Sequence, residues 1–261
     1  VLAGNGLPGN SGDGGPARSA RLFSYASRGG IAVYPAGEVF FQIGALAVIG
    51  ADGTISTVSY VGSPDQIALG PDGSFYFTFS GENRIRRLTP LGQLVLFAGN
   101  GSTGSGGDGG NAPDAQVEAP FAIAVDAAGN VYVSELSNGQ RVRKIDTAGI
   151  ISTVAGGGAV WGDGPAVQRA LSYPQGLLFD NVGNLIIVEH GAYLRRVVNG
   201  TMETIAGTIG CVTSSPDGTP LATAELAMSD SVVYLANGEI VFFDATRSRF
   251  RKITTGRVLA N

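Results

Sequence analysis

Hydrophobic and polar positions alternate in blocks along this chain, and the clearest block covers residues 123–155. Four runs rich in Val, Ile and Tyr are separated by two turns that contain Gly129 and Gly149 and by a longer connection in the middle. Glycine permits the positive φ that such turns often require. Short apolar runs joined by glycine-containing turns are typical of antiparallel strands. The block therefore predicts one four-stranded antiparallel sheet, with strands at residues 123–126, 131–135, 140–145 and 150–155.

The same block occurs five times, with copies that begin at Ile31, Ile67, Ile123, Leu177 and Val232. The first runs are apolar almost throughout, which suits strands buried on both faces, whereas the outer runs mix Thr and Ser with Val and Ile. Because a sheet with two faces to cover cannot stand alone, the sheets are expected to pack around an axis. We predict an all-β propeller of five four-stranded antiparallel blades, in a single domain over residues 1–261, with helices no longer than single turns. The alternative is a six-bladed propeller or part of a longer array.

A repeated phrase precedes several of the blocks. It reads Gly-Asp-Gly-Gly-Pro-Ala at residues 12–17, with variants at residues 107–112, 162–166 and 216–220. A spacing of roughly 40 to 55 residues is typical of propeller arrays. The phrase offers a single acid in each copy, whereas dedicated calcium loops commonly supply several. We therefore favour turns over calcium loops, with backbone N–H groups bonded to Asp13, Asp108 and Asp163.

Two motifs recur in the third and fourth blocks. They are Pro120-Phe121-Ala122 followed by Arg141-Val142-Arg143-Lys144, and Pro174-Gln175-Gly176 followed by Leu194-Arg195-Arg196. With the Gly-Asp-Gly-Gly phrase they resemble the NHL repeat, especially its bacterial secreted and teneurin-like form. The resemblance covers almost the whole chain, although the first block lacks the arginines and no insertion precedes the second. It implies a β-propeller and leaves the activity open, since similar proteins include RNA binders, adhesion scaffolds and lyases.

Arginines recur at a spacing of two on the third run of several blocks, as Arg84 and Arg86, Arg141 and Arg143, and Arg249 and Arg251. We favour a repeated surface or inter-blade contact, paired with turn carboxylates, over an anion-binding role. The formal net charge of −4 argues against a nucleic-acid partner, because such a partner requires a basic face that neutralises phosphates.

Cysteine content and loop composition bear on the compartment. Cys211 is the only cysteine, which excludes a disulfide within the chain. No run is long and apolar enough for a transmembrane helix. Long loops rich in Gly, Ser and Asn, together with few lysines, favour a secreted, extracytoplasmic bacterial protein whose leader lies outside this sequence.

The two ends of the chain match the same position of the repeat. Residues 1–4 and residues 257–260 both resemble the outer strand of a blade. Propellers commonly let one terminus complete a blade so that few backbone groups stay unpaired. We expect one of the two segments to complete the last blade and the other to be displaced.

Strand direction places the long connections, the starts of the first strands and the ends of the second strands on one face. The aligned starts are Gly29, Asp65, Phe121, Gln175 and Asp230, and the aligned ends are Ile43, Phe79, Glu135, Glu189 and Asp244. We predict a ligand site at the channel mouth on this face. Its expected residues are Asp65, Phe121, Gln175, Asp230, Glu135, Glu189 and Asp244.

Propellers of the gluconolactonase and paraoxonase type, which are similar at this level, hold a divalent ion at the channel mouth. The similarity implies a calcium ion with Asp65 and Asp230 as ligands, because calcium accepts carboxylate oxygens. For the acids that end the second strands, and also for Asp65 and Asp230, the alternative is a structural role, such as a bond to local backbone N–H groups or to an adjacent arginine. His190 is the candidate catalytic residue, as a general base. It is the only histidine, so a zinc site with several His ligands is excluded.

Trp161 and Tyr173 are the notable aromatic residues near this face. They either add an aromatic contact for a ligand or form a hydrophobic plug under the loop, and we favour the plug.

Two functional hypotheses follow from these observations. The first is an extracytoplasmic binding or scaffold module that contacts a protein, glycan or small molecule through the insertion-bearing face. The alternative is a metal-dependent hydrolase or lactonase, or a lyase, with its site at the channel mouth.

Overall fold

The computed structural model describes residues 1–9, 11–22, 31–34, 36–42, 45–137, 140–190, 193–208, 214–226, 228–244, 246–254 and 259–260. Gly29, Ile43 and Cys211 lie outside the described residues.

The described strands form five antiparallel sheets, each with its four main strands hydrogen-bonded in chain order. The first sheet contains β1 (Ile31–Val33), β2 (Val39–Gln42), β3 (Leu46–Ile49) and β4 (Ile55–Ser59). The second contains β5 (Gln66–Leu69), β6 (Phe75–Phe79), β7 (Arg84–Leu88) and β8 (Leu94–Ala98). The third contains β9 (Pro120–Val125), β10 (Val131–Glu135), β11 (Arg141–Ile145) and β12 (Ile151–Gly156).

The fourth sheet contains β14 (Pro174–Phe179), β15 (Leu185–Glu189), β16 (Tyr193–Val198) and β17 (Thr201–Gly207). Its outer edge carries β13 (Gly164–Pro165), a short strand from the preceding insertion that pairs with β17. The fifth sheet contains β18 (Met228–Tyr234), β19 (Ile240–Asp244), β20 (Arg249–Ile253) and β21 (Leu259–Ala260). The helices of the described residues are 3-10 turns, namely η1 (Ala17–Ser19), η2 (Ser80–Glu82), η3 (Ala112–Asp114), η4 (Ala166–Gln168) and η5 (Leu221–Thr223).

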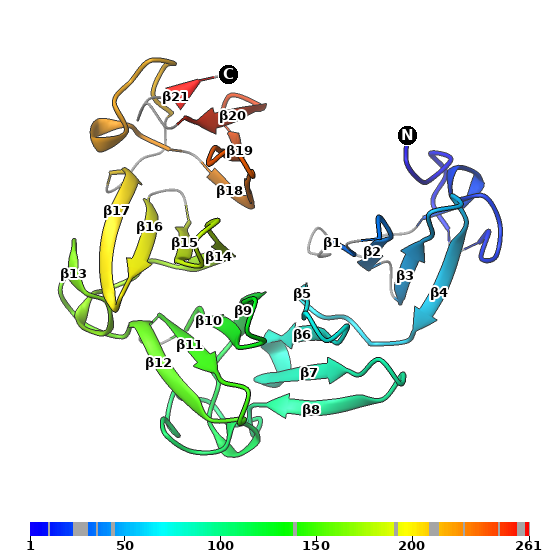
Figure 1. Ribbon diagram of the computed structural model, residues 1–261, viewed down its shortest axis with the longest axis horizontal. Helices are drawn as coiled ribbons and strands as arrows, with labels where there is room; N and C mark the ends of the chain where they lie inside the picture. The colour runs from blue at the N-terminus through cyan, green and yellow to red at the C-terminus, as the bar shows by residue number, and fades with distance from the viewer. Residues whose placement is uncertain are drawn as a thin grey trace.

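The sheets follow one another around a common centre in chain order (Figure 1). The innermost strands are β1, β5, β9, β14 and β18, and consecutive strands of this series contact each other from β1 to β18. This arrangement is the predicted five-bladed β-propeller, and the prediction of an all-β fold without long helices is confirmed. In Figure 1 the arc is open between the first sheet and the fifth.

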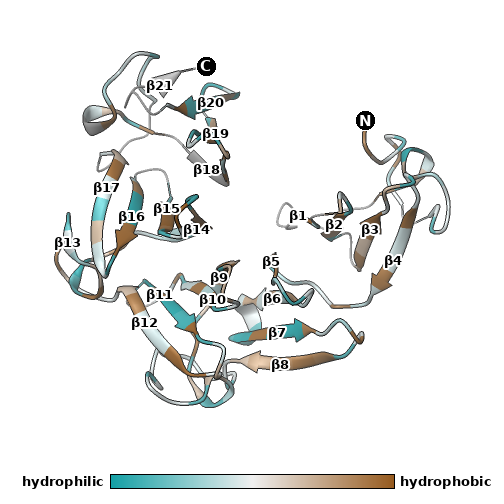
Figure 2. Cartoon of the chain, viewed as in Figure 1, coloured by the Kyte–Doolittle hydropathy of each residue, from teal (hydrophilic) through white to brown (hydrophobic). Residues whose placement is uncertain are grey.

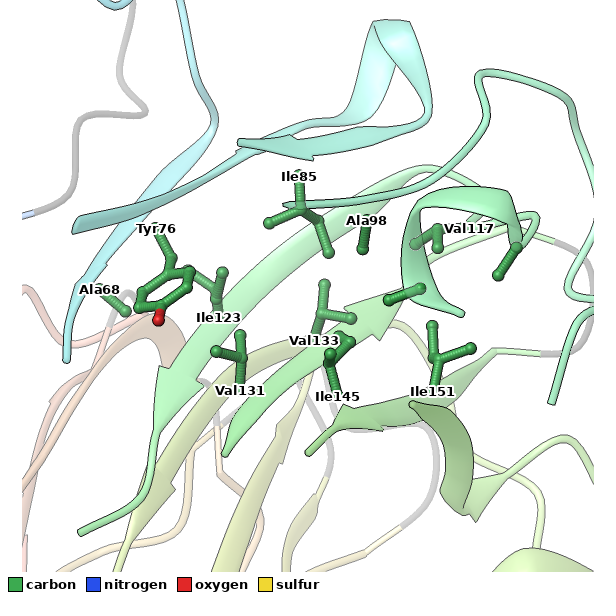
Figure 3. Close-up of a cluster of buried hydrophobic side chains, with 12 residues drawn as sticks. Ala68, Tyr76, Ile85, Ala98, Val117, Ile123, Val131, Val133, Ile145 and Ile151 are labelled. Atoms are coloured by element: carbon green, nitrogen blue, oxygen red, sulfur yellow. The ribbon is translucent and has the colours of Figure 1, made fainter. Parts of the chain in front are cut away.

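Hydrophobic side chains fill the space between adjacent blades. Between the second and third sheets, Ile85 packs with Val133 in a cluster of fully buried residues (Figure 3). The insertion before the third sheet covers the outer part of this cluster, through Ala112 of η3 and through Val117. Gly107 allows the insertion to approach so closely, because a Cβ at this position would lie 2.8 Å from Ala115 and its φ is +96°. Figure 2 shows hydrophilic stretches within β7 and β11, where the arginines lie.

The two end sheets each leave one hydrophobic face uncovered, as a comparison of equivalent positions shows. One position on the third strand is occupied by Leu46, Ile85, Val142, Leu194 and Phe250 in the five sheets. The first four are 0% exposed, whereas Phe250 is 70% exposed. On the other side of the arc, Ile31 of β1 is 69% exposed. The same position is buried in the next two sheets, where it is occupied by Ile67 and Ile123.

The ends of the chain behave as the repeat predicts. Leu259 and Ala260 form β21 and pair with Ile253 and Lys252, so the C-terminal segment supplies the outer strand of the fifth sheet. Residues 1–4 belong to no strand. Instead, the backbone N–H of Gly4 donates to the carbonyl of Ala17 at 2.9 Å, which docks the N-terminal segment on the first insertion.

Candidate functional site

Three of the expected channel-mouth acids are buried inside the blades. Glu135 ends β10, and its Oε1 lies 3.0 Å from Nη1 of Arg143 in β11. The side chains are 1% and 0% exposed. The same pair forms between Glu189 and Arg195 at 2.8 Å, and its two members are 0% and 2% exposed. These carboxylates therefore face the neighbouring strand and not an open channel mouth.

The fifth sheet repeats this pair with an aspartate. Asp244 ends β19, and its Oδ2 lies 3.1 Å from Nη1 of Arg251, with both side chains fully buried. The expected carboxylate ring is thus corrected for all three acids. The physical reason is that a buried arginine must be paired, because an isolated buried charge costs several kcal/mol. The alternative given by the sequence, a bond to an adjacent arginine, is the contact that all three acids make.

The aspartates of the repeated phrase complete these pairs from the insertions. Asp108 accepts from Nε of Arg143 at 3.0 Å through Oδ1 and from the backbone N–H of Thr153 at 3.1 Å through Oδ2. Asp163 accepts from the N–H of Thr204 at 2.9 Å. Each aspartate therefore ties an insertion to the outer strand of the blade that follows it. The turn interpretation correctly predicts that these aspartates accept from backbone N–H groups, but the partners lie on the outer strand and not within the turn.

A buried arginine paired with an acid occurs in the third, fourth and fifth sheets, and an insertion precedes each of these sheets. No insertion precedes the second sheet, and there Phe79 stands in place of the acid, under the guanidinium of Arg86 at 4.8 Å. Arg86 pairs instead with Glu82 at 2.5 Å, and both side chains are partly exposed. The first sheet has the insertion but carries Ala47 where the arginine would lie, opposite Thr57. In the third, fourth and fifth sheets the arginines therefore help to fix the insertions on the blades, whereas the first insertion is held without one.

Burial and hydrogen bonding shift the pKa of these acids in different directions. Burial raises the pKa of Glu135 and of Glu189 and outweighs the neighbouring arginines, which act to lower it. For Asp244, burial also acts to raise the pKa, but hydrogen bonds from Ser214, Thr246 and Arg251 outweigh it, so the pKa is lowered. These shifts arise from groups of the blades and of the insertions that dock on them.

Two other expected site residues meet on the surface of the fourth sheet. Gln175 lies at the start of β14, where the register with β15 shifts between Pro174 and Gly176. His190 follows β15, and its Nδ1 lies 2.8 Å from Oε1 of Gln175. The backbone N–H of His190 donates to the carbonyl of Tyr173 at 3.1 Å. In the tautomer in which Nδ1 donates to Gln175, Nε2 is left as an acceptor that can act as a base.

Two of the remaining expected residues make other contacts. Asp65 accepts from the backbone N–H of Ser80 at 2.7 Å and thereby holds the end of β6. Phe121 is 2% exposed, and its carbonyl accepts from the hydroxyl of Thr78 at 2.7 Å. Phe121 is thus a core residue with no surface open to a ligand. Asp230 lies in β18, and its side chain is outside the described part of the structure.

The two expected calcium ligands include Asp230, which lies outside the described side chains. Among the described side chains, no three from His, Cys, Asp or Glu come together in a way that could hold a metal ion. Asp65 uses a carboxylate oxygen on the Ser80 N–H. Calcium takes six to eight oxygen ligands, commonly including several carboxylates, so the described residues around Asp65 do not form such a cage.

Trp161 and Tyr173 are both about half-exposed, at 51% and 52%. This exposure does not fit a hydrophobic plug under the loop, and the aromatic contact for a ligand stays a prediction. Tyr173 adopts a left-handed backbone conformation with φ of 43°, and its N–H donates to Oε1 of Gln140 at 2.6 Å. Sequence reasoning does not single out Gln140. The only feature of the sequence that marks Gln140 is its position at the start of the third run of its block.

Comparison with known proteins adds to this geometry. Residues 100–160 match the teneurin NHL domain. The match covers the insertion before the third sheet and all four strands of that sheet, including the pair of Glu135 and Arg143. The resemblance to the NHL repeat is thereby confirmed over this segment.

Solved structures with the same fold belong to proteins with different activities. Virginiamycin B lyase from Staphylococcus aureus, solved as a catalytically inactive His-to-Ala variant with quinupristin, is 18% identical with a TM-score of 0.59, over 88% of this chain and 68% of that one. A gluconolactonase from Xanthomonas campestris is 15% identical with a TM-score of 0.61, over 90% and 76%. An auxiliary nutrient binding protein from Bacteroides thetaiotaomicron is 12% identical with a TM-score of 0.68, over 93% and 61%. At these identities the likeness shows the fold alone.

Within the described residues, no helix has the length and apolar character needed to cross a membrane.

Proposed function

We propose that this NHL-type propeller is a secreted binding or scaffold module that holds its ligand on the insertion-bearing face. The observation that carries the proposal is the use of Glu135, Glu189 and Asp244 as buried partners of arginines. Acids that could have formed a reactive cluster at the channel mouth instead anchor the insertions. The insertions thereby become a fixed surface, which favours recognition because less freedom is lost on binding.

The insertion-bearing face also presents groups suited to recognition. Trp161 and Tyr173 are half-exposed on the insertion between β12 and β14. Aromatic side chains of this kind are common anchors in binding sites, because they bury a large area and have few rotatable bonds. The auxiliary nutrient binding protein from Bacteroides shows that this fold is used in a protein named for binding.

A comparison of variants on the two faces tests the proposal. Purified protein is screened by surface plasmon resonance against arrays of proteins, glycans and small molecules. We expect a ligand whose binding is lost in the double variant Trp161→Ala, Tyr173→Ala. The same ligand should bind the control variants Leu91→Ala and Val182→Ala, which alter exposed side chains in turns on the opposite face. A ligand that responds only to the control variants would overturn the proposal.

A second candidate is a hydrolase, lactonase or lyase that uses His190, and the contact between His190 and Gln175 favours it. Two of the solved structures are a gluconolactonase and a lyase whose His-to-Ala variant is catalytically inactive. In this candidate, Gln175 orients the imidazole and Nε2 removes a proton from the substrate. Because the described donors around Asp65 do not form a calcium cage, no step is assigned to a metal ion.

Turnover assays decide between the two candidates. The wild type is assayed with lactones, esters and a streptogramin of the quinupristin type, in excess calcium and in chelator. Turnover that disappears in His190→Ala and falls in Gln175→Leu would establish the enzyme. If calcium raises both turnover and melting temperature in the wild type but not in Asp65→Asn, Asp65 would be assigned as a ligand. No turnover on any substrate, combined with ligand binding, supports the binding module.

A further inference from the structure

We infer that a pocket beside Trp161 binds a neutral pyranose ring, as the terminal or internal residue of a glycan. This inference rests on the proposed binding function and names its ligand class. The pocket has a volume of about 320 Å³ and is lined by Gln140, Gly158, Trp161, Leu171 and Ser172. This volume lies at the lower end of the range of roughly 300–1,000 Å³ for small-molecule sites, which suits one sugar ring with its rim open to solvent.

The walls of the pocket match the two-sided character of a pyranose. Trp161 offers a half-exposed aromatic surface, and Leu171, which is 4% exposed, offers a buried aliphatic one. A pyranose has an apolar face of C–H groups that packs against such surfaces. Its hydroxyl groups lie around the edge, where the amide of Gln140 and the residue Ser172 supply polar partners. Sites of this kind combine apolar walls with a few placed polar groups.

The polar residues of the pocket are held in fixed positions. Oε1 of Gln140 accepts from the N–H of Tyr173 at 2.6 Å, which orients the amide and directs its NH2 group away from that bond. The backbone N–H of Ser172 donates to Oε2 of Glu189 at 2.7 Å. The buried pair of Glu189 and Arg195 therefore supports the pocket from below. Polar partners fixed in this way lose little freedom when a ligand binds.

The loop that carries Trp161 is also held in place. The N–H of Gly158 donates to the carbonyl of Arg169 at 3.2 Å, and the N–H of Ala170 donates to the carbonyl of Val160 at 2.8 Å. A Cβ at position 158 would lie 2.0 Å from the carbonyl oxygen of Gln168, so only glycine permits this approach. The two segments thus form a preformed wall for the aromatic ring.

The charge of the lining selects among ligands. None of the five lining residues carries a charge at neutral pH, and the chain as a whole has a formal net charge of −4. An acidic sugar would find no cationic partner in the lining and would be repelled by the net charge. A cationic ligand would find no carboxylate among the lining residues. A neutral sugar needs no charged partner in the lining and is not repelled by the net charge.

Trp161 is the only tryptophan, so tryptophan fluorescence, excited selectively over tyrosine, reports on this pocket. The wild type is titrated with neutral methyl pyranosides and their oligosaccharides, with glucuronate, and with a proline-rich peptide. We expect a saturable change in tryptophan fluorescence with at least one neutral sugar and none with glucuronate. The affinity of that sugar, measured by calorimetry, should fall by roughly tenfold or more in Trp161→Ala, as for the loss of an aromatic anchor.

Val167→Ala is the matched control, because Val167 lies in the same insertion, is also 51% exposed and does not line the pocket. It should bind the sugar with wild-type affinity. A fluorescence response to the peptide alone, or equal binding of glucuronate, would overturn the sugar assignment and leave the binding function standing. Binding of a sugar that Trp161→Ala does not weaken would also overturn it. The absence of binding by every ligand on the arrays would remove the proposed function itself.

Discussion

Arg143 is fully buried, and the charges around it account for its presence in the core. It contacts Glu135 from its own sheet and Asp108 from the insertion, so one guanidinium joins two segments that are distant in sequence. A buried pair of this kind contributes little net stability compared with hydrophobic residues of similar size. The pair instead fixes the insertion relative to the sheet, because the planar guanidinium can donate hydrogen bonds to several oxygens at once.

Glu135→Gln tests this network. The substitution keeps the shape of the side chain and leaves Arg143 with Asp108 as its remaining carboxylate, so we expect the free energy of unfolding to fall by about 1.5–3 kcal/mol. The matched control is Glu82→Gln, which removes a partly exposed pair with Arg86 and should cost less than about 1 kcal/mol. Urea unfolding followed by circular dichroism measures both. Equal effects of the two substitutions would contradict the assignment of the buried pair.

Tyr132 gives a prediction at alkaline pH. Burial, with the charge of Asp126 and a hydrogen bond to it, raises the pKa of Tyr132 from 10.0 to about 12. Between these values the unfolded chain loses the phenolic proton while the folded protein keeps it. The contribution of Tyr132 to stability is therefore complete below pH 10 and decreases as the pH rises toward about 12.

Ultraviolet absorbance of tyrosinate during an alkaline titration checks the pKa of Tyr132. Burial also raises the pKa of Tyr76, so we expect the late ionisation of the wild type to lose the contribution of one tyrosine in Tyr132→Phe. Tyr60→Phe is the control, because Tyr60 is 82% exposed and should leave the late ionisation unchanged. A late ionisation that persists undiminished in Tyr132→Phe would assign it to other tyrosines.

At the scale of the elements, equivalent positions of the five sheets differ in their environment. Leu194 of β16 is fully buried between the fourth and fifth sheets, whereas Phe250 of β20 is 70% exposed at the open face of the fifth sheet. Leu194→Ala should therefore lower the free energy of unfolding by about 2–5 kcal/mol. Phe250→Ala should change it by a few tenths of a kcal/mol, as for a surface substitution. Thermal and urea unfolding of both variants provide the measurement, and a large loss for Phe250→Ala would show that its face is covered in solution.

The whole propeller could be predicted from the sequence because its repeats are local patterns. Short apolar runs and glycine-containing turns determine each sheet, and the apolar inner strands require neighbours on both sides. The direction of individual side chains could not be predicted in the same way. Glu135 ends its strand as expected, but only packing decides that it turns toward Arg143. Phe121 lies where the ladder shifts register, so its side chain enters the core.

The exposure of Trp161 could not be predicted either, because it depends on the path of an insertion outside the repeat. Hydrogen bonds to Val160 and from Gly158 fix that path, and neither position carries a recognisable motif. The contact between His190 and Gln175 could be predicted from the sequence in part. Both residues could be placed on one face from strand direction, and the structure adds their separation of 2.8 Å.

The distribution of stability around the molecule follows from the contacts between blades. The third sheet packs on neighbours at both faces, as the burial of Ile123 and Val142 shows, whereas Ile31 of the first sheet and Phe250 of the fifth are largely exposed. In repeat architectures, stability is approximately a sum of terms for each unit and for each interface with a neighbour. The end sheets lack one of these interface terms and should open more readily.

Native-state hydrogen exchange followed by mass spectrometry measures this difference. We expect the slowest exchange for peptides from β9 to β12 and faster exchange for β1 to β4 and β18 to β21. The substitution Leu194→Ala weakens the interface between the fourth and fifth sheets, so it should accelerate exchange in the fifth sheet more than in the second. Uniform protection of all five sheets would mean that the propeller opens as one cooperative unit, and the additive description would then be wrong for this protein.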